Sequence, residues 1–485
     1  MGYALTRSQK YGEAEKAFAD FLTTKGNDSE LISDAYLRLA DCQFMQKKVV
    51  QAIANYDKCA KLEQPDADYA LFQIALLHGY QKELNKKVST LDNLLKKYPA
   101  TGYRTEAEFE LASTYHALNQ YQKAIDAYQD FIKTYPKNGL VRQAYNKLAQ
   151  AHWNNNEAES AISTFKHVLE NYSGSQEARD ALVNLETMYA EMGNPAEFYE
   201  YAQSKNLTFS TSRQDSISYK SAENKFIRGE LEAAYKGFSD YLKQFPKGMF
   251  VPNALFYKAE YDYDNNRLND ALAGYELLIS DYLTENQETT LRKAGLIQFN
   301  KNNNQKAFNY FSQLLEIASN ENNRILANNG VMRAGYELQK YNEVKKSAEY
   351  IIASSQAQRE VKNDAGLYAG RAAMALNDLN AAKKHFAVLA ETPVNENSTE
   401  AAYHIAFIEL KQNNLPEAEA AILKIINGNY FGEYWIASTY ILYGDWYAAS
   451  GKAFQARNTY QSIIDNYDGE DLRKIAQEKL DKLTE

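Results

Sequence analysis

Residues 107–136, AEFELASTYHALNQYQKAIDAYQDFIKTYP, contain the pattern that decides the fold. Apolar side chains recur in this stretch every three or four residues, which is the spacing of one stripe on an α-helix and not the alternation of a strand. One apolar set ends before Asn119 and Gln120, and a second set begins at Tyr121. The stretch therefore predicts two amphipathic helices joined by a short polar turn.

The second of these helices contains Ala124 and, four positions later, the aromatic residue Tyr128. The same two positions recur along the whole chain at steps of 35 to 38 residues. The first position holds Ala14, Ala52, Lys87, Ala124, Ala161, Phe198, Ala234, Ala271, Ala307, Val344, Ala382, Ala418 and Ala456. The second holds Phe18, Tyr56, Leu91, Tyr128, Phe165, Ala202, Phe238, Tyr275, Phe311, Ala348, Phe386, Ile422 and Tyr460. Such a period predicts stacked helix pairs, because one pair cannot bury its apolar stripe alone.

This pattern resembles the tetratricopeptide repeat. One unit matches the family at Ala112, Tyr115, Ala124, Tyr128 and Pro136, and another at Gly444, Tyr447, Ala456 and Tyr460. The resemblance covers nearly the whole chain, although the period is longer than the usual ~34 residues. It implies an all-α, right-handed superhelical solenoid of stacked antiparallel helix pairs, with about 12 to 13 repeats. It also implies a non-enzymatic scaffold that binds a peptide or a partner protein in its concave groove.

Several repeats end in Tyr-Pro or Phe-Pro, at Tyr98-Pro99, Tyr135-Pro136 and Phe245-Pro246. In this respect the chain is similar to bacterial cell-envelope members of the family. That likeness implies a role in an envelope complex and favours the periplasm or the periphery of the outer membrane, with the cytoplasm as the alternative.

The repeat pattern divides the chain into four segments. We expect an N-terminal array over 1–203, an irregular linker or hinge over 204–216, a second array over 217–469 and a capping helix over 470–485. The alternative for the linker is a longer loop. Counting back from Ala14 puts the small residue of the first helix at Gly2, so half of that helix is missing. We therefore expect the chain to be excised from a longer protein.

Composition and motifs exclude several functions. The net charge is −9, and the 54 Lys and Arg residues are mixed among 63 Asp and Glu residues. Since nucleic acid binding needs a basic stripe, we expect no nucleic acid partner. We find no run of about 18 apolar residues that would span a membrane. No glycine-rich phosphate loop, HExxH or paired CxxC motif is present, so we expect no catalytic activity, cofactor or metal. The oligomeric state is open.

Two other functions remain open at this point. The chain can be a structural spacer or oligomerisation element of a longer protein. It can also be the regulatory module of an enzyme or sensor whose catalytic domain lies outside this sequence. Groove aromatics that are buried against neighbouring repeats would favour the spacer.

Four residues within the repeats have more than one interpretation. Cys42 and Cys59 are expected to be buried thiols, with a disulfide between them as the alternative. Lys258 and Asp262 lie on an expected inner stripe, four residues apart. They indicate either an ion pair along the helix or a shift of the helix.

The binding prediction rests on the first helix of each pair. In the family these helices line the concave face, and ligands are held one turn before and one turn after the small residue. Those positions are Phe72, Phe109, His116, Trp153, Tyr219, Phe226, Phe256, Tyr263, Phe299, Tyr336 and Tyr403. They predict an aromatic ladder that holds a peptide, and the alternative is that the rings stack on neighbouring repeats. Between them, Arg292, Arg333 and Arg371 are predicted to bind an acidic side chain or a C-terminal carboxylate.

Overall fold

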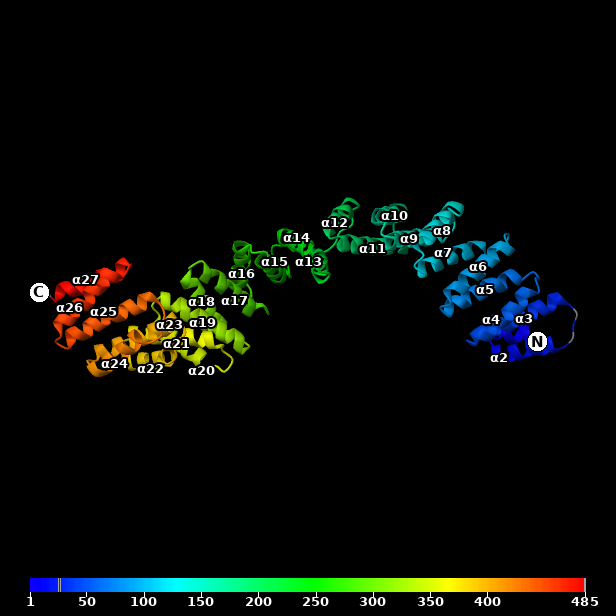
Figure 1. Cartoon of the computed structure of the whole chain (residues 1–485). Coiled ribbons are helices and arrows are strands. Elements are labelled where there is room, and N and C mark those ends of the chain that lie inside the picture. The colour runs from blue at the N-terminus through cyan, green and yellow to red at the C-terminus, as the bar shows by residue number, and fades with distance from the viewer. Residues whose placement is uncertain (25, 27, 484–485) are drawn as a thin grey trace. The chain divides into compact units, whose positions relative to one another are not determined.

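The computed structural model describes residues 1–24, 26 and 28–483. Over these residues the chain forms α-helices and no strand, which confirms the predicted all-α solenoid of helix pairs (Figure 1). Consecutive helices pack against one another from α1 to α12 and from α14 to α27. We call the odd-numbered helices up to α25 the A helices and the even-numbered ones the B helices; α27 follows the last pair.

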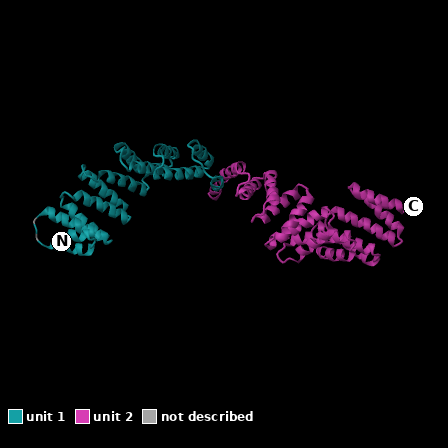
Figure 2. Ribbon diagram, turned by 180° about the vertical axis from the view of Figure 1, so that it is seen from behind, with its two compact units in different colours: residues 1–221 teal, residues 222–485 magenta. Residues whose placement is uncertain are grey.

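The structure divides into two compact units, Met1–Ser221 (unit 1) and Ala222–Glu485 (unit 2), as Figure 2 shows. The first helices are α1 (Gly2–Arg7), α2 (Tyr11–Thr23), α3 (Ser29–Met45), α4 (Val49–Lys61), α5 (Ala67–Tyr80), α6 (Leu84–Lys97), α7 (Arg104–Ala117), α8 (Tyr121–Thr134), α9 (Val141–Asn154), α10 (Ala158–Asn171), α11 (Gln176–Met192), α12 (Pro195–Ser204) and α13 (Thr211–Ile227). They are followed by α14 (Leu231–Gln244), α15 (Val251–Asp264), α16 (Leu268–Asp281), α17 (Gln287–Asn300), α18 (Asn304–Ile317), α19 (Glu321–Glu337), α20 (Tyr341–Ala353), α21 (Arg359–Ala375), α22 (Leu379–Ala390), α23 (Glu396–Lys411), α24 (Leu415–Ile426), α25 (Glu433–Ala449), α26 (Ala453–Asn466) and α27 (Glu470–Lys482).

A small residue of the A helix receives the aromatic ring of the B helix in the same pair. A Cβ atom on Gly370 would lie 2.3 Å from the Phe386 ring, and one on Gly444 would lie 2.4 Å from the Tyr460 ring. Both rings are fully buried. Because a side chain at either glycine would collide with the ring, a small residue on the A helix accompanies the aromatic residue on the B helix, and this pairing contributes to the period of the sequence.

The turn between an A helix and its B helix contains one residue in the left-handed region. The φ angle lies between 57° and 63° at Lys47, Lys82, Asn119, Asn156, Asn266, Asn302, Gln339, Asn377 and Asn413. Glycine takes this place at Gly193, Gly229 and Gly451. Asparagine and glycine prevail because they adopt this conformation at the lowest cost.

The junction between the arrays differs from the prediction. Helix α13 begins at Thr211, so residues 211–216 are helical and the irregular stretch between α12 and α13 is limited to 205–210. The sequence pattern missed this first part because the inner side chains of α13 are polar: Asp215, Ser218 and Ser221 are all buried. A hinge at this junction stays a prediction.

The last helix, α27, packs on the final pair of unit 2. Leu472 and Ala476 of α27 are buried against the final pair, whereas Ile475 is 41% exposed. The predicted cap over 470–485 is helical from Glu470 to Lys482, and residues 484–485 lie outside the described part of the chain.

The structure decides between the alternatives given for the two cysteines and for Lys258 and Asp262. Cys42 and Cys59 are buried free thiols and form no disulfide. The Lys258 Nζ atom lies 2.8 Å from Asp262 Oδ2, which confirms the ion pair along the helix. Burial alone would lower the pKa of Lys258, but the hydrogen bond to Asp262 and its charge outweigh this effect and raise it.

Candidate functional site

The aromatic ladder expected on an open groove is largely packed between helices. Phe72, Phe109 and Tyr219 are buried, and Phe226 is exposed at 38%. The others are half-buried: His116, Trp153, Phe256, Tyr263, Phe299, Tyr336 and Tyr403. These positions are thus mostly packed, in line with the alternative that the rings stack on neighbouring repeats, and a binding role for the individual rings stays a prediction.

The physical reason is that neighbouring helices supply partners for these rings. Phe72 stacks on Tyr103 with 5.3 Å between the ring centroids. Tyr403 lies 5.3 Å from Trp435 of the next A helix. Such ring pairs stabilise the stack by themselves, without a ligand.

Two of the three predicted carboxylate-binding arginines already have carboxylate partners. Arg333 Nη2 lies 2.5 Å from Asp364 Oδ2 of the next A helix. Arg371 donates to both carboxylate oxygens of Glu400, again from the next A helix. Arg292 is half-buried. Arg333 and Arg371 therefore join repeats to one another.

In other repeats the charges are reversed, and a carboxylate on the A helix links two helices. Glu260 Oε1 accepts a hydrogen bond of 2.5 Å from the hydroxyl of Tyr275 on the B helix. Its Oε2 atom accepts one of 2.7 Å from Lys293 on the next A helix. Burial, together with Glu260, raises the pKa of Tyr275 above its usual range, so this hydroxyl remains a donor.

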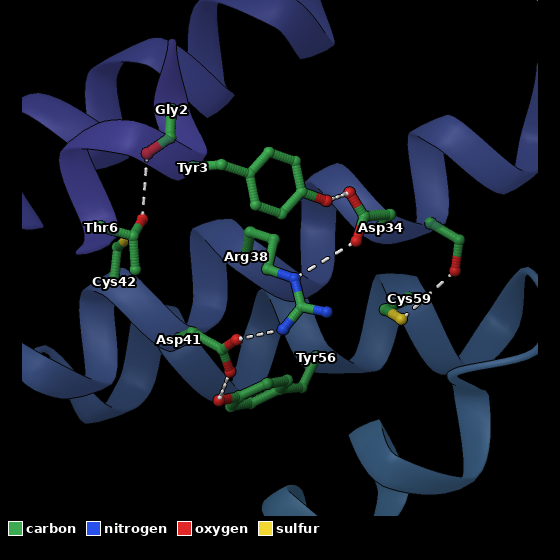
Figure 3. A network of polar contacts seen from close by, with 10 residues as sticks. Gly2, Tyr3, Thr6, Asp34, Arg38, Asp41, Cys42, Tyr56 and Cys59 are labelled. Carbon is green, nitrogen blue, oxygen red and sulfur yellow. Dashed lines mark hydrogen bonds and ion pairs between the residues drawn. The ribbon is translucent and has the colours of Figure 1, made fainter.

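The same link occurs at the N-terminal end of unit 1, with an arginine from the same helix (Figure 3). Asp41 accepts a hydrogen bond of 2.6 Å from the hydroxyl of Tyr56. Arg38 lies between Asp41 and Asp34, at 3.1 and 3.2 Å. The hydroxyl of Tyr3 donates to Asp34, which ties α1 to α3.

Two of the predicted rings, Phe226 and Phe256, border an open cleft, which we call the aromatic cleft. It has a volume of about 200 Å³ and lies where α13, α14 and α15 meet. Its lining is Phe226, Leu231, Ala234, Tyr235, Phe238, Phe256, Tyr257, Glu260, Tyr261 and Asp264. The walls are set by ring pairs, with 4.6 Å between the centroids of Phe226 and Tyr257.

The charges of the aromatic cleft are mixed. Glu260 is engaged with Tyr275 and Lys293, whereas Asp264 is exposed. The guanidinium of Arg267 lies 4.5 Å from the centroid of the Tyr235 ring and covers one part of the wall. The lining is thus mostly apolar, with a carboxylate at its edge.

Sequence reasoning found Phe226 and Phe256 but missed the three tyrosines of this cleft. Tyr257 and Tyr261 lie next to the predicted positions on α15, and Tyr235 is on the B helix. The available signal was the aromatic density of residues 256–263, FYKAEYDY.

Comparisons with known families match most of the chain. Residues 294–485 match a tetratricopeptide repeat-like domain, and residues 1–68, 69–101, 106–138 and 143–173 match tetratricopeptide repeats. The chain belongs to the tetratricopeptide repeat family. Repeats of this family are generally non-catalytic and support a protein-interaction scaffold.

Solved structures match this chain at low identity and with low TM-scores. The structure of Naa15/Naa10 bound to HypK-THB is 15% identical, with a TM-score of 0.36, and the match covers 99% of this chain and 77% of that one. Yeast Tom70 is 13% identical, with a TM-score of 0.29 and coverages of 94% and 96%. A tetratricopeptide repeat protein from Parabacteroides merdae is 15% identical, with a TM-score of 0.28 and coverages of 57% and 100%. A comparison with curated proteins finds no match.

No group of His, Cys, Asp or Glu side chains in the described part of the chain is arranged to hold a metal ion. No helix among the described residues is long and apolar enough to cross a membrane.

Proposed function

We propose that this tetratricopeptide repeat protein is a non-enzymatic scaffold whose aromatic cleft holds an apolar side chain of a partner peptide. The observation that carries the proposal is the exposure of Phe226. Phe226 is exposed, whereas the other ten predicted ladder positions are buried or half-buried. Its ring forms a wall of the aromatic cleft.

The size of the cleft supports a peptide side chain over a small molecule. Its volume of about 200 Å³ is below the roughly 300–1,000 Å³ of small-molecule sites. Aromatic anchors in such pockets carry much of the energy of protein interfaces. The rings already contact one another, so the pocket is formed before binding and the ordering cost is small. Asp264 at the edge favours a basic residue beside the anchor.

The Tyr-Pro and Phe-Pro repeat ends support a place for this scaffold in a bacterial envelope complex. Fractionation of the source cells tests this part of the proposal. Recovery in the periplasmic or outer-membrane fraction is expected, and recovery in the cytoplasm would overturn it.

Selection of a peptide library on the intact protein tests the binding proposal. Selected peptides are expected to share an apolar anchor with a basic neighbour. Their affinity, measured by fluorescence anisotropy, should fall by about 30-fold in Phe226→Ala, which corresponds to a hot-spot loss of ~2 kcal/mol. Phe454→Ala is the matched control, because Phe454 is 73% exposed in the same unit and lies outside the cleft.

A second candidate function is a structural spacer, and the packing of the other ladder rings favours it. If no peptide is selected, or if selected peptides bind Phe226→Ala and Phe454→Ala equally, the aromatic cleft is not the binding site. The spacer would then be the better description.

A further inference from the structure

A second cleft lies in unit 1, between α10, the start of α11 and the end of α12. We call it the cationic cleft. Its volume is about 530 Å³, and it is lined by Leu169, Glu170, Ser173, Gly174, Ala178, Arg179, Leu182, Tyr201, Lys205 and Leu207. This volume is within the roughly 300–1,000 Å³ of small-molecule sites.

The cleft exists because one B helix is short. Helix α12 has 10 residues, whereas α10, the B helix of the preceding pair, has 14. The difference is about one helical turn. That missing turn would follow Ser204 and pack over Ala178 and Leu182 at the start of α11, so both residues line the cleft instead.

The floor of the cationic cleft combines apolar side chains with an unused hydroxyl. Leu169, Leu182 and Leu207 supply apolar surface. The Tyr201 hydroxyl oxygen is buried and has no hydrogen-bond partner among the described residues. Burial raises the pKa of Tyr201 to about 12, so the hydroxyl keeps its proton at neutral pH. A buried donor without an acceptor is costly, and a bound acceptor would remove that cost.

The rim carries more positive than negative charge. Lys205 Nζ lies 2.7 Å from Glu170 Oε1. The Arg179 guanidinium donates to the Gln176 side chain and to the Gly174 carbonyl oxygen, neither of which is charged. Lys166 Nζ lies 4.5 Å from the centroid of the Tyr201 ring. Among the lining residues two cations, Arg179 and Lys205, thus face one carboxylate, and Lys166 adds a third positive charge beside the Tyr201 ring, which suits an anionic ligand.

We propose that the cationic cleft binds a small amphipathic carboxylic acid, whose chain covers the leucines and whose carboxylate lies at Arg179 and Lys205. The apolar floor excludes a fully polar anion, and the charge of the rim excludes a cationic amphiphile. The site is separate from the aromatic cleft, and the proposal does not depend on peptide binding there.

Isothermal titration of the intact chain with decanoate, below its micelle-forming concentration, tests the ligand class. Decanol and decyltrimethylammonium are the probes with the same chain and a neutral or reversed head group. Decanoate is expected to bind at least about tenfold more tightly than either, a difference of 1.4 kcal/mol. Equal binding of the three probes, or no binding of decanoate, would overturn the proposal.

Variants of exposed rim residues then locate the site without disturbing the core. Arg179→Gln and Lys205→Met should each weaken decanoate binding by about tenfold, because each removes one charged partner of the carboxylate. Ser173→Trp should block the cleft. Arg142→Gln and Lys96→Met are the matched controls on the exposed surface of unit 1 and should bind like the wild type.

Circular dichroism checks whether the variants keep their helical content. Unchanged decanoate affinity in Arg179→Gln, Lys205→Met and Ser173→Trp would show that binding occurs elsewhere and would overturn the assignment. A loss in these three variants but not in the controls supports it.

Discussion

Phe226 and Tyr336 occupy equivalent positions of two A helices in unit 2, yet Phe226 borders an open cleft and Tyr336 is covered. Each ring meets a tyrosine of the next A helix. The centroids of Phe226 and Tyr257 are 4.6 Å apart, and those of Tyr336 and Tyr368 are 5.2 Å apart. The two ring pairs join the same positions of the repeat, with an interplanar angle of 44° for Phe226 and Tyr257 and of 87° for Tyr336 and Tyr368. We call them the open pair and the covered pair.

The difference lies three residues after the tyrosine, where the open pair has Glu260 and the covered pair has Arg371. The Arg371 guanidinium lies 5.9 Å from the Tyr336 centroid and 5.7 Å from that of Tyr368, and Glu400 holds it there. Glu260 instead bonds to the B helix and to the next A helix. The charge at this position thus differs between the two pairs, and a guanidinium lies beside the rings of the covered pair.

Removing the Arg371 side chain from the covered pair should have the largest effect on stability. Arg371→Ala leaves the carboxylate of Glu400, which is 3% exposed, without its arginine partner. We expect a loss of about 3 kcal/mol in the free energy of unfolding, as for one partner of a buried pair. Urea unfolding followed by tryptophan fluorescence measures it. Lys293→Ala is the counterpart at the open pair, and it should cost about 1 kcal/mol because Glu260 keeps Tyr275; equal losses would contradict this account.

The pH dependence of the covered pair should follow Glu400. Burial alone would raise the pKa of Glu400, but hydrogen bonds from His404 and Arg371 outweigh it and lower the pKa below its ordinary value. A carboxyl whose pKa is lower in the folded state contributes stability above its unfolded pKa, and that contribution is lost as the pH falls through the folded pKa. The stability should therefore decrease below about pH 4.5, near the ordinary pKa of a glutamate.

Glu400→Gln isolates this effect. The variant should be less stable than the wild type at neutral pH, by less than Arg371→Ala, because the Arg371 side chain remains 27% exposed to water. Its stability should fall less steeply in acid. A variant with the same acid dependence as the wild type would show that other carboxylates control it.

The open pair should be sensitive to the hydroxyl that holds Glu260. Tyr275→Phe removes the donor at 2.5 Å and should cost about 1.5 kcal/mol, the lower end of the range for a hydrogen bond to a charged group. The equivalent B-helix position behind Arg371 is Phe386, which has no hydroxyl. Tyr350→Phe is the control, because Tyr350 is 37% exposed and bonds to Glu321 at the surface. Thermal unfolding of both variants measures the difference.

The fold could be predicted because it depends on local rules that repeat. The small residue and the ring that covers it, such as Gly370 with Phe386, must recur together, so a single unit of the sequence predicts the whole stack. The sequence pattern did not predict the first part of α13 as helix, because Asp215 and Ser218 are buried where apolar residues were expected. The periodicity of apolar residues reveals a helix only where the buried side chains are apolar, and it misses a helix whose buried side chains are polar.

The candidate site was less predictable because exposure depends on the neighbouring repeat. Phe226 and Tyr336 have the same place in the pattern, and the side chain that separates them, Glu260 or Arg371, lies more than 30 residues further along the chain. The cationic cleft follows from the shortness of α12, which no motif signals. The sequence therefore indicated which rings face the next repeat and not which of them stay uncovered.

The smallest expected effect concerns the turns that follow the two rings. Gly229 follows Phe226 with φ at 79°, and Gln339 follows Tyr336 with φ at 57°. A Cβ atom at Gly229 would meet nothing within 4 Å, so substitution there acts through the backbone alone. Gly229→Ala should lower the free energy of unfolding by about 1 kcal/mol, the penalty of an L-residue in the left-handed conformation.

Gln339→Asn should raise the free energy of unfolding by a few tenths of a kcal/mol, on the order expected when asparagine relieves the same strain. Thermal unfolding gives both signs, and a destabilising Gln339→Asn would mean that contacts of the Gln339 side chain outweigh its backbone conformation.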